Sequence, residues 1–192
     1  IKSASVTIAC DSGIKLFRRF NMAPSYLIGD MDSAEEKDVE WAKSMGVKVL
    51  KFPPEKNELD TELALIMARG LQENKAVLSG VLGSRIDQSM AGIYLLAAYN
   101  DLDSEISEEY INIGTVKKRK VFNALKDETW TVLPLGGQVN GLNLLGYKYE
   151  LTNKHLNPWD TLGVSNQAAG EKVEISLSEG IVCYIRWIGK KV

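Results

Sequence analysis

Acidic residues recur in four short segments of the N-terminal half, each closely following a run of apolar residues. Asp30 and Asp32 are two residues apart in the sequence Gly-Asp-Met-Asp-Ser, and Asp11, Asp60 and Asp87 lie in the other three segments. Carboxylates that crowd together repel one another unless a cation neutralises them. Mg²⁺ prefers oxygen ligands and often bridges one or two carboxylates to substrate phosphates. If the fold brings these segments together, they predict a site for magnesium and phosphate.

The sequence predicts alternating strands and helices across the first hundred residues. The acidic segments fall in the loops that follow the strands. Apolar runs at Ser5–Cys10, Tyr26–Ile28, Val47–Phe52 and Ala76–Leu82 predict four strands, each followed by a helical pattern. Such alternation is typical of βαβ units with a parallel sheet. The loops after parallel strands lie along the carboxyl edge of the sheet, where ligands bind in open α/β folds. We therefore expect the acidic residues to converge at that edge.

Each acidic residue also has a structural alternative, because Asp commonly caps the N-terminus of a helix. Capping is the better interpretation for Asp60 or Asp87 taken alone. The pair Asp30 and Asp32 differs, since Ser33 with Glu36 three residues on predicts a capping box for the next helix. Because all the strand–helix loops carry Asp at the same predicted edge, we favour a binding site.

The pattern changes from about Ser104 to short β-rich runs broken by Gly, Asn and Pro, which is typical of a small antiparallel sandwich or barrel. We predict an α/β fold in which an N-terminal Rossmann-like domain with a parallel sheet, residues 1–103, precedes a small antiparallel β-sandwich domain, residues 104–192. The expected strands of the second domain are Tyr110–Ile113, Arg119–Phe122, Trp130–Leu135, Leu144–Leu151, Lys172–Leu177 and Ile181–Trp187.

Composition and charge exclude several classes of function. The net charge is −2 without a basic excess, which gives no support to binding of nucleic acid or of anionic membranes. No apolar run approaches the roughly 20 residues that span a bilayer. Cys10 and Cys183 make no disulfide framework and fit a reducing, cytoplasmic location. With His155 as the single histidine, a metal ion must be a hard cation held by carboxylates.

The acidic loops, taken in sequence order, resemble the signatures of the thiamine pyrophosphokinase (thiamine diphosphokinase) family. The family's Gly-Asp-x-Asp-Ser signature matches Gly29-Asp30-Met31-Asp32-Ser33, and further matches occur toward both ends of the chain. These further matches are Cys10-Asp11-Ser12-Gly13, Lys56-Asn57-Glu58-Leu59-Asp60-Thr61-Glu62, Gly83-Ser84-Arg85-Ile86-Asp87-Gln88 and Gly163-Val164-Ser165-Asn166. The matches span nearly the whole chain, and four motifs in order with a β-rich second half are strongly specific.

The resemblance implies an enzyme that transfers diphosphate from ATP to thiamine, giving thiamine diphosphate and AMP. It implies ATP and Mg²⁺ in the first domain, thiamine in the second, and a homodimer with sites between its subunits. The implied catalytic residues are Asp30, Asp32, Asp60 and Asp87, of which the first three are the implied metal ligands. The implied ATP- and thiamine-binding residues are Asp11, Gly13, Ser33, Lys56, Arg85, Gln88, Tyr149, Ser165 and Asn166.

The sequence departs from the family pattern at two positions of the third motif. Asn57 stands where the family often has Asp, and Leu59 where it often has Thr. Tyr149 stands where the family often has Trp, so an aromatic ring there either faces the thiamine rings or packs across strands. Trp159 and Trp187 are expected in the core or at an interface.

Two other functions stay open at this point. One is a different Mg²⁺-dependent phosphotransferase or phosphohydrolase that uses the same acidic edge. The other is a non-catalytic regulator that binds thiamine or a nucleotide, which Asn57 and Leu59 would fit. Within the favoured reaction the thiamine hydroxyl attacks the β-phosphorus of ATP, and Asp60 or Asp87 accepts its proton.

Overall fold

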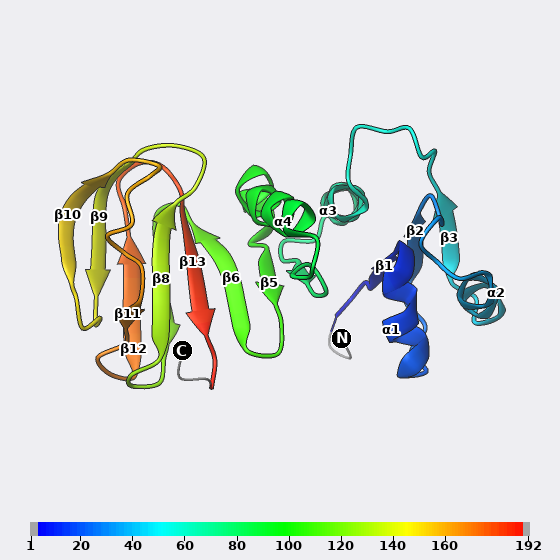
Figure 1. Cartoon of the computed structure of the whole chain (residues 1–192), viewed down its shortest axis with the longest axis horizontal. Helices are drawn as coiled ribbons and strands as arrows, with labels where there is room; N and C mark the ends of the chain where they lie inside the picture. Colours follow the sequence, from blue (N-terminus) through cyan, green and yellow to red (C-terminus); the bar gives the residue numbers. More distant parts are fainter. Residues whose placement is uncertain (1–3, 190–192) are drawn as a thin grey trace. The chain divides into compact units, whose positions relative to one another are not determined.

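The computed structural model describes residues 4–189 and divides into two compact units, Ile1–Gln72 and Glu73–Val192 (Figure 1). Both helices and sheets are present, so the chain is mixed α/β as the sequence predicts. The predicted domain boundary between residues 103 and 104 stays a prediction.

The first unit is built on a parallel sheet in the order β1-β2-β3. Its central strand is mostly apolar, with Leu27 and Ile28 fully buried. Leu27 shares a core with Ile14 of the first α-helix and Ala42 of the second. The elements of this unit are β1 (Ile8–Cys10), the 3₁₀ turn η1 (Asp11–Gly13), α1 (Ile14–Arg19), β2 (Tyr26–Gly29), α2 (Glu36–Ser44), β3 (Lys48–Lys51) and α3 (Asp60–Gly70).

The second unit contains two sheets in its described residues, one in the order β10-β9-β12-β7 and one in the order β11-β8-β13-β6-β5-β4. Buried side chains of both sheets share one core, so the sheets pack face to face; Leu142 and Ile175 come from the first sheet, Trp130 and Val132 from the second. The strands are β4 (Val77–Leu78), β5 (Glu105–Ser107), β6 (Ile111–Val116), β7 (Arg119–Asn123), β8 (Thr129–Pro134), β9 (Val139–Leu145), β10 (Leu151–Leu156), β11 (Asn166–Gln167), β12 (Lys172–Ser176) and β13 (Val182–Trp187).

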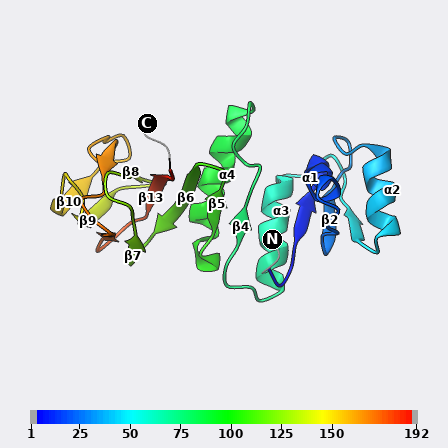
Figure 2. The same ribbon diagram turned by 90° about the horizontal axis from the view of Figure 1, so that it is seen from below.

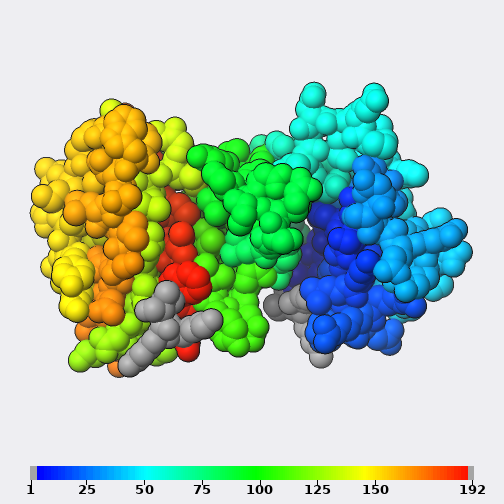
Figure 3. Space-filling view, in the orientation of Figure 1, coloured from blue at the N-terminus to red at the C-terminus, as the bar shows by residue number. Residues whose placement is uncertain are grey.

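One helix packs on the six-stranded sheet, over β5 and β6. α4 (Ile86–Ala98) contacts β6, and its Leu96 shares a core with Ile106 of β5 and Ile113 of β6 (Figure 2). Figure 3 shows the surface of this part of the chain in green. In α4, Ile86, Met90 and Tyr94 leave more than half of their surface exposed. The 3₁₀ turn η2 (Asn100–Leu102) follows and leads into β5.

The structure corrects two sequence expectations about strands. The fourth strand does not join the parallel sheet, because β4 pairs in parallel with β5, Val77 opposite Glu105. The expected single strand Leu144–Leu151 is two strands, the end of β9 and the start of β10, separated by a turn at Gly146. Gly146 has φ +77°, and a Cβ there would collide with the carbonyl oxygen of Lys172. None of the helices in residues 4–189 has the length and hydrophobicity to cross a membrane.

The buried ring of Trp130 gives a test of the core of the second unit. It is fully buried, donates its indole N–H to Glu128 at 3.2 Å, and lies 5.2 Å from the ring of Phe122. We expect Trp130→Ala to lower the free energy of unfolding by about 3–5 kcal/mol. Leu125→Ala, at a side chain 65% exposed, should change it by less than about 0.5 kcal/mol. Urea unfolding of both variants measures the difference, and equal stabilities would contradict this description of the core.

Candidate functional site

Three carboxylates from the first two loops of the parallel sheet lie together. β1 and β2 are in parallel register, with Cys10 opposite Ile28, so Asp11 and Asp30 follow neighbouring strand ends. Asp11, Asp30 and Asp32 each place one carboxylate oxygen within 4.8 Å of the others. The structure therefore brings together three of the residues that the sequence singles out.

Unusual backbone conformations allow this approach. Gly29 has φ +140°, and a Cβ at this position would occupy the space of the Asp11 carboxylate. Asp11 (φ 43°) and Met31 (φ 68°) adopt left-handed backbone conformations, which are uncommon outside glycine and cluster at functional sites. The N–H of Met31 donates to Asp11 Oδ1 at 3.1 Å, and the N–H of Asp32 donates to Asp30 Oδ1 at 2.9 Å. The loop backbone thus fixes two of the three carboxylates.

Asp60 and Lys56 border this acidic cluster. α3 begins at Asp60, whose N-cap is Leu59, so Asp60 is not a cap. Lys56 Nζ lies 3.1 Å from Asp60 Oδ1, and these side chains are only 13% and 23% exposed. Burial acts to lower the pKa of Lys56, but the carboxylates of Asp60, Asp30 and Asp11 raise it overall. Lys56 is therefore a fixed positive charge beside the cluster.

The crowding of carboxylates changes their affinity for protons. Burial, a hydrogen bond with Asp60 and the charges of Asp60 and Asp30 raise the pKa of Asp11 to about 7, although the N–H of Met31 opposes them. At Asp30, the hydrogen bond from the N–H of Asp32 outweighs the effect of burial, so the pKa of Asp30 is lowered. The cluster therefore retains a proton near neutrality. Its donor set consists of carboxylate oxygens, which fits a hard divalent cation such as Mg²⁺.

Arg85 and Asp87 belong to the second unit and contact each other. The guanidinium group of Arg85 donates two hydrogen bonds to the Asp87 carboxylate, at 2.9 and 2.6 Å, and both side chains are about two-thirds exposed. Asp87 is the second residue of α4, whose N-cap is Arg85, so it is not a cap either. Gln88 follows Asp87 on the exposed surface.

The predicted capping box at Ser33 is wrong. α2 begins at Glu36 with Glu35 as its N-cap, and the carbonyl of Glu35 accepts the N–H groups of Asp38 and Val39. Ser33 is an exposed loop residue. Asp30 and Asp32 still lie outside the helix, so the correction leaves them without a capping role. Gly13 is the N-cap of α1 with φ −58°, a conformation open to any residue.

The residues expected at thiamine lie close together in the second unit. Asn166 is 3% exposed; its amide donates to the carbonyl of Tyr149 at 2.8 Å and accepts the N–H of Tyr149 at 3.1 Å. Its oxygen also accepts the N–H of Gln167 at 2.9 Å. Tyr149 itself is 60% exposed, which does not fit buried cross-strand packing. Ser165 adopts φ 57° and donates its N–H to Thr131 Oγ1 at 3.2 Å.

Two tryptophans were expected in the core or at an interface, and the structure narrows this choice for one of them. Trp159 is 76% exposed, so it is not a core residue. Trp187, at the end of β13, is partly buried.

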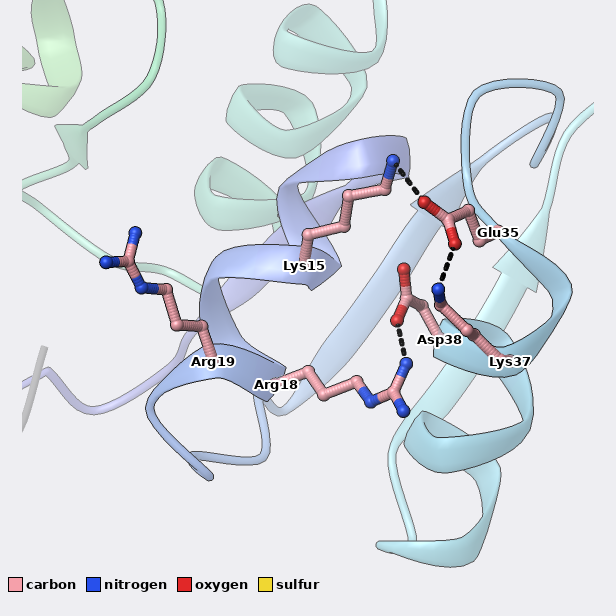
Figure 4. Close-up of a pocket in the computed structure, with 6 residues that line it drawn as sticks. All are labelled: Lys15, Arg18, Arg19, Glu35, Lys37 and Asp38. Atoms are coloured by element: carbon pink, nitrogen blue, oxygen red, sulfur yellow. Dashed lines mark hydrogen bonds and ion pairs between the residues drawn. The ribbon is translucent and has the colours of Figure 1, made fainter.

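A second group of charges, between α1 and α2, was not predicted from the sequence. Glu35 lies between Lys15 and Lys37, at 2.9 and 2.6 Å, and these two lysines lower the pKa of Glu35 to about 2 (Figure 4). Arg18 pairs with the buried Asp38. Each acid therefore has a basic partner, and we interpret the group as contacts that join the two helices.

Comparison with known proteins gives one family for both parts of the chain. The model of the thiamin pyrophosphokinase catalytic domain matches residues 1–107, and the model of the thiamin pyrophosphokinase vitamin B1 binding domain matches residues 116–182. A thiamine pyrophosphokinase of Bacillus subtilis (strain 168) is 26% identical over 189 residues, covering 93% of this chain and 86% of the relative.

Solved structures agree over nearly the whole chain. Thiamin pyrophosphokinase from Geobacillus thermodenitrificans has a TM-score of 0.83 at 26% identity, over 96% of this chain and 86% of that one. The Bacillus subtilis structure gives 0.84 at 23% identity, over 95% and 87% of the two chains. Yeast thiamin pyrophosphokinase gives 0.76 at 17% identity, over 97% and 80%. The likeness to these last two structures concerns the fold alone.

The raised pKa of Asp11 predicts how pH affects the stability of the metal-free protein. The folded protein binds this proton more tightly than the unfolded chain, whose Asp titrates near pH 4. This contribution to stability is present in acid and is lost as the pH rises toward about 7. A cation competes with the proton for the Asp11 carboxylate, so Mg²⁺ binds more easily when that carboxylate is ionised. The rise in melting temperature caused by Mg²⁺ should therefore be larger at about pH 8 than at about pH 6.

Asp11→Asn provides the control for this prediction. It removes the titrating group at nearly constant size, so the stabilisation by Mg²⁺ should become smaller and less dependent on pH. A Mg²⁺ effect in Asp11→Asn that matches the unmodified protein at both pH values would exclude Asp11 from the cation site.

Proposed function

The chain belongs to the thiamin pyrophosphokinase family, and we propose that its Asp11, Asp30 and Asp32 carboxylates hold the Mg²⁺ ion that binds ATP. Its activity is the transfer of a diphosphate group from ATP to the hydroxyl of thiamine, which gives thiamine diphosphate and AMP. The observation that carries the metal proposal is the approach of these carboxylate oxygens to within 4.8 Å of one another.

The position of the cluster supports a role in binding phosphate. Asp11 and Asp30 follow the carboxyl ends of two neighbouring parallel strands, the edge at which α/β folds bind nucleotides. Mg²⁺ supplies positive charge that neutralises phosphate oxygens as diphosphate is transferred. Lys56, beside Asp60, would add its positive charge to that of Mg²⁺. We propose that Lys56 contacts the phosphates of ATP.

The proton of the thiamine hydroxyl needs an acceptor, for which the sequence offers Asp60 or Asp87. Asp60 borders the acidic cluster in the same unit, as its effect on the pKa of Asp11 indicates. The two hydrogen bonds from Arg85 lower the pKa of Asp87 to about 2, which makes Asp87 a weak proton acceptor. We therefore propose Asp60 as the acceptor, and we retain Arg85 and Gln88 as predicted contacts of ATP.

We propose that the β-rich part binds thiamine through Tyr149 and Ser165. The exposed aromatic side chain of Tyr149 suits a flat cationic ring system. Asn166 supports this role by fixing the backbone of Tyr149, because its amide group accepts the N–H of Tyr149 and donates to its carbonyl oxygen. A Rossmann-like ATP domain followed by a β-sandwich thiamine domain is the arrangement we propose, with family-model matches at residues 1–107 and 116–182 in support.

We further propose a homodimer with the β-rich parts at the interface. Exposed apolar side chains in that part, among them Trp159 (76% exposed) and Leu162 (59%), support an apolar contact. Sedimentation at micromolar concentration tests this proposal, since a monomer there would contradict it.

The function is tested by resolving the products of a reaction with ATP, Mg²⁺ and thiamine. We expect AMP and thiamine diphosphate in equal amounts. ADP would indicate a conventional kinase, inorganic phosphate a hydrolase, and binding without turnover a regulator.

Asp30→Asn and Asp32→Asn test the metal proposal directly. Each keeps the size of the side chain and removes its charge, so turnover should fall by about 10²-fold or more. Folding should remain intact, because Asn keeps the size of the side chain and, at position 30, an oxygen that can accept the N–H of Asp32. Extra Mg²⁺ should restore part of the rate. Glu40→Gln, which removes an exposed charge from the same unit, should leave turnover unchanged. Near-normal turnover in both Asp variants would return these residues to a structural role.

Ser165→Ala and Asn166→Ala test the division of substrates between the two parts. Loss of a neutral hydrogen bond at Ser165, or of the bonds by which Asn166 holds the Tyr149 backbone, should raise the KM for thiamine by up to about tenfold. The KM for ATP should change little. Lys154→Ala, at an exposed position of β10, serves as the control. Steady-state kinetics with each substrate varied measures both constants. A larger effect on ATP than on thiamine would contradict this assignment.

A further inference from the structure

Glu108 lies where two parallel strands of the second unit end. β4 and β5 are in parallel register, with Leu78 opposite Ile106. Glu108 follows β5, and the segment Ser79–Gly83 follows β4 toward α4, so both leave the sheet at its carboxyl edge. This segment leads directly to Arg85, the N-cap of α4.

The Glu108 carboxylate binds the backbone of that segment. Its Oε1 atom accepts the N–H groups of Gly80 at 2.8 Å, Val81 at 3.0 Å and Leu82 at 3.4 Å. Its Oε2 atom accepts the hydroxyl of Ser79 at 3.3 Å. Successive backbone N–H groups that converge on one point form a concavity that binds anions. In this chain, the anion in that concavity is a side chain of the protein itself.

The same segment is held on its other side by α4. Ser89, which is 8% exposed, accepts the N–H of Gly83 at 3.2 Å, and its hydroxyl lies 3.1 Å from the carbonyl oxygen of Val81. The side chain of Val81 occupies the space that a Cβ at Gly92 would need. With Ser89 on one side and Glu108 on the other, the backbone from Gly80 to Gly83 has a defined course into Arg85.

We propose that Glu108 is a positioning residue for diphosphate transfer, which acts by fixing the Gly80–Leu82 backbone and thereby the place of Arg85. The proposal rests on the proposed function, in which Arg85 contacts the phosphates of ATP. Without the carboxylate, three neighbouring N–H groups lose their common acceptor. The segment before Arg85 is then held by the contacts of Ser89 and the packing of Val81 and Leu82. Charge-assisted hydrogen bonds of this kind are stronger than neutral ones, so Glu108 contributes substantially to the order of the segment.

The test compares Glu108→Ala, Glu108→Gln and the control Glu109→Ala in the full chain. Glu109 is the exposed neighbour in sequence and has the same charge, and its interaction is with Tyr110. Steady-state kinetics gives kcat and the KM for ATP and for thiamine. Amide hydrogen exchange of Gly80, Val81 and Leu82 reports the order of the segment independently of activity.

We expect Glu108→Ala to lower kcat/KM for ATP by on the order of 10- to 100-fold, since misplacing a binding group by about 1 Å has effects of this size. The KM for thiamine should change little, and the three amides should exchange faster. Glu108→Gln retains an acceptor oxygen, so it should restore most of the activity and of the protection. Glu109→Ala should match the unmodified protein.

Several outcomes would overturn the proposal. Glu108→Ala with normal kinetics and normal exchange in an active protein would show that the segment is ordered without Glu108. A lower KM for ATP in Glu108→Ala would show that Glu108 instead competes with phosphate for the N–H groups. If Glu108→Ala does not fold, the Gln variant decides, because a folded Gln variant without activity contradicts positioning by hydrogen bonds. Failure of the proposed function is separate, since it would appear as absence of thiamine diphosphate in the unmodified protein.

Discussion

The close approach of the carboxylates of Asp11, Asp30 and Asp32 is the constraint on which the candidate site depends. Their oxygens lie within 4.8 Å of one another, a separation at which like charges disfavour full ionisation unless a cation is present. The chain holds them there with left-handed backbone at Asp11 and Met31 and with a glycine at position 29 whose missing Cβ makes room for Asp11. The parallel sheet and its tight loops therefore hold three carboxylates at the position that we propose for a cation.

The second unit uses a related device, in which a polar side chain binds backbone groups and so fixes a loop. Asn166 bonds both the N–H and the carbonyl of Tyr149, and Glu108 bonds three successive N–H groups before α4. Buried or half-buried backbone groups need partners, so each of these side chains satisfies a local requirement while it places an exposed residue. Tyr149 and Arg85, the residues thus placed, are those with chemistry suited to an aromatic cation and to phosphate.

The sequence predicts the acidic site better than it predicts the sheets. Asp30 and Asp32 follow a strongly apolar strand, so their place at a strand end follows from the alternation of apolar runs and helices. β4 is different, because a strand of two residues is too short for its sequence to indicate which strand lies beside it. It pairs with β5 in another sheet. Ser33 and Glu36 have the spacing of a capping box, yet the helix starts at Glu36. The carbonyl of Glu35 accepts the N–H groups of Asp38 and Val39, so Glu35 is the N-cap. The hydrogen bonds of Asn166 to Tyr149, and of Glu108 to Gly80–Leu82, join segments that are distant in the sequence. They depend on how the strands pair, which no local sequence pattern specifies.

The most direct test of this account is a crystal structure of the protein with Mn²⁺ in place of Mg²⁺, in which anomalous scattering locates the ion. We expect a peak within about 2.0–2.4 Å of carboxylate oxygens from Asp11, Asp30 and Asp32, as for small divalent cations bound by oxygen. Asp30→Asn should weaken or abolish this peak, while Glu40→Gln should leave it unchanged. A strong peak elsewhere with none at these three residues would contradict the claim that the carboxyl edge of the parallel sheet is the cation site.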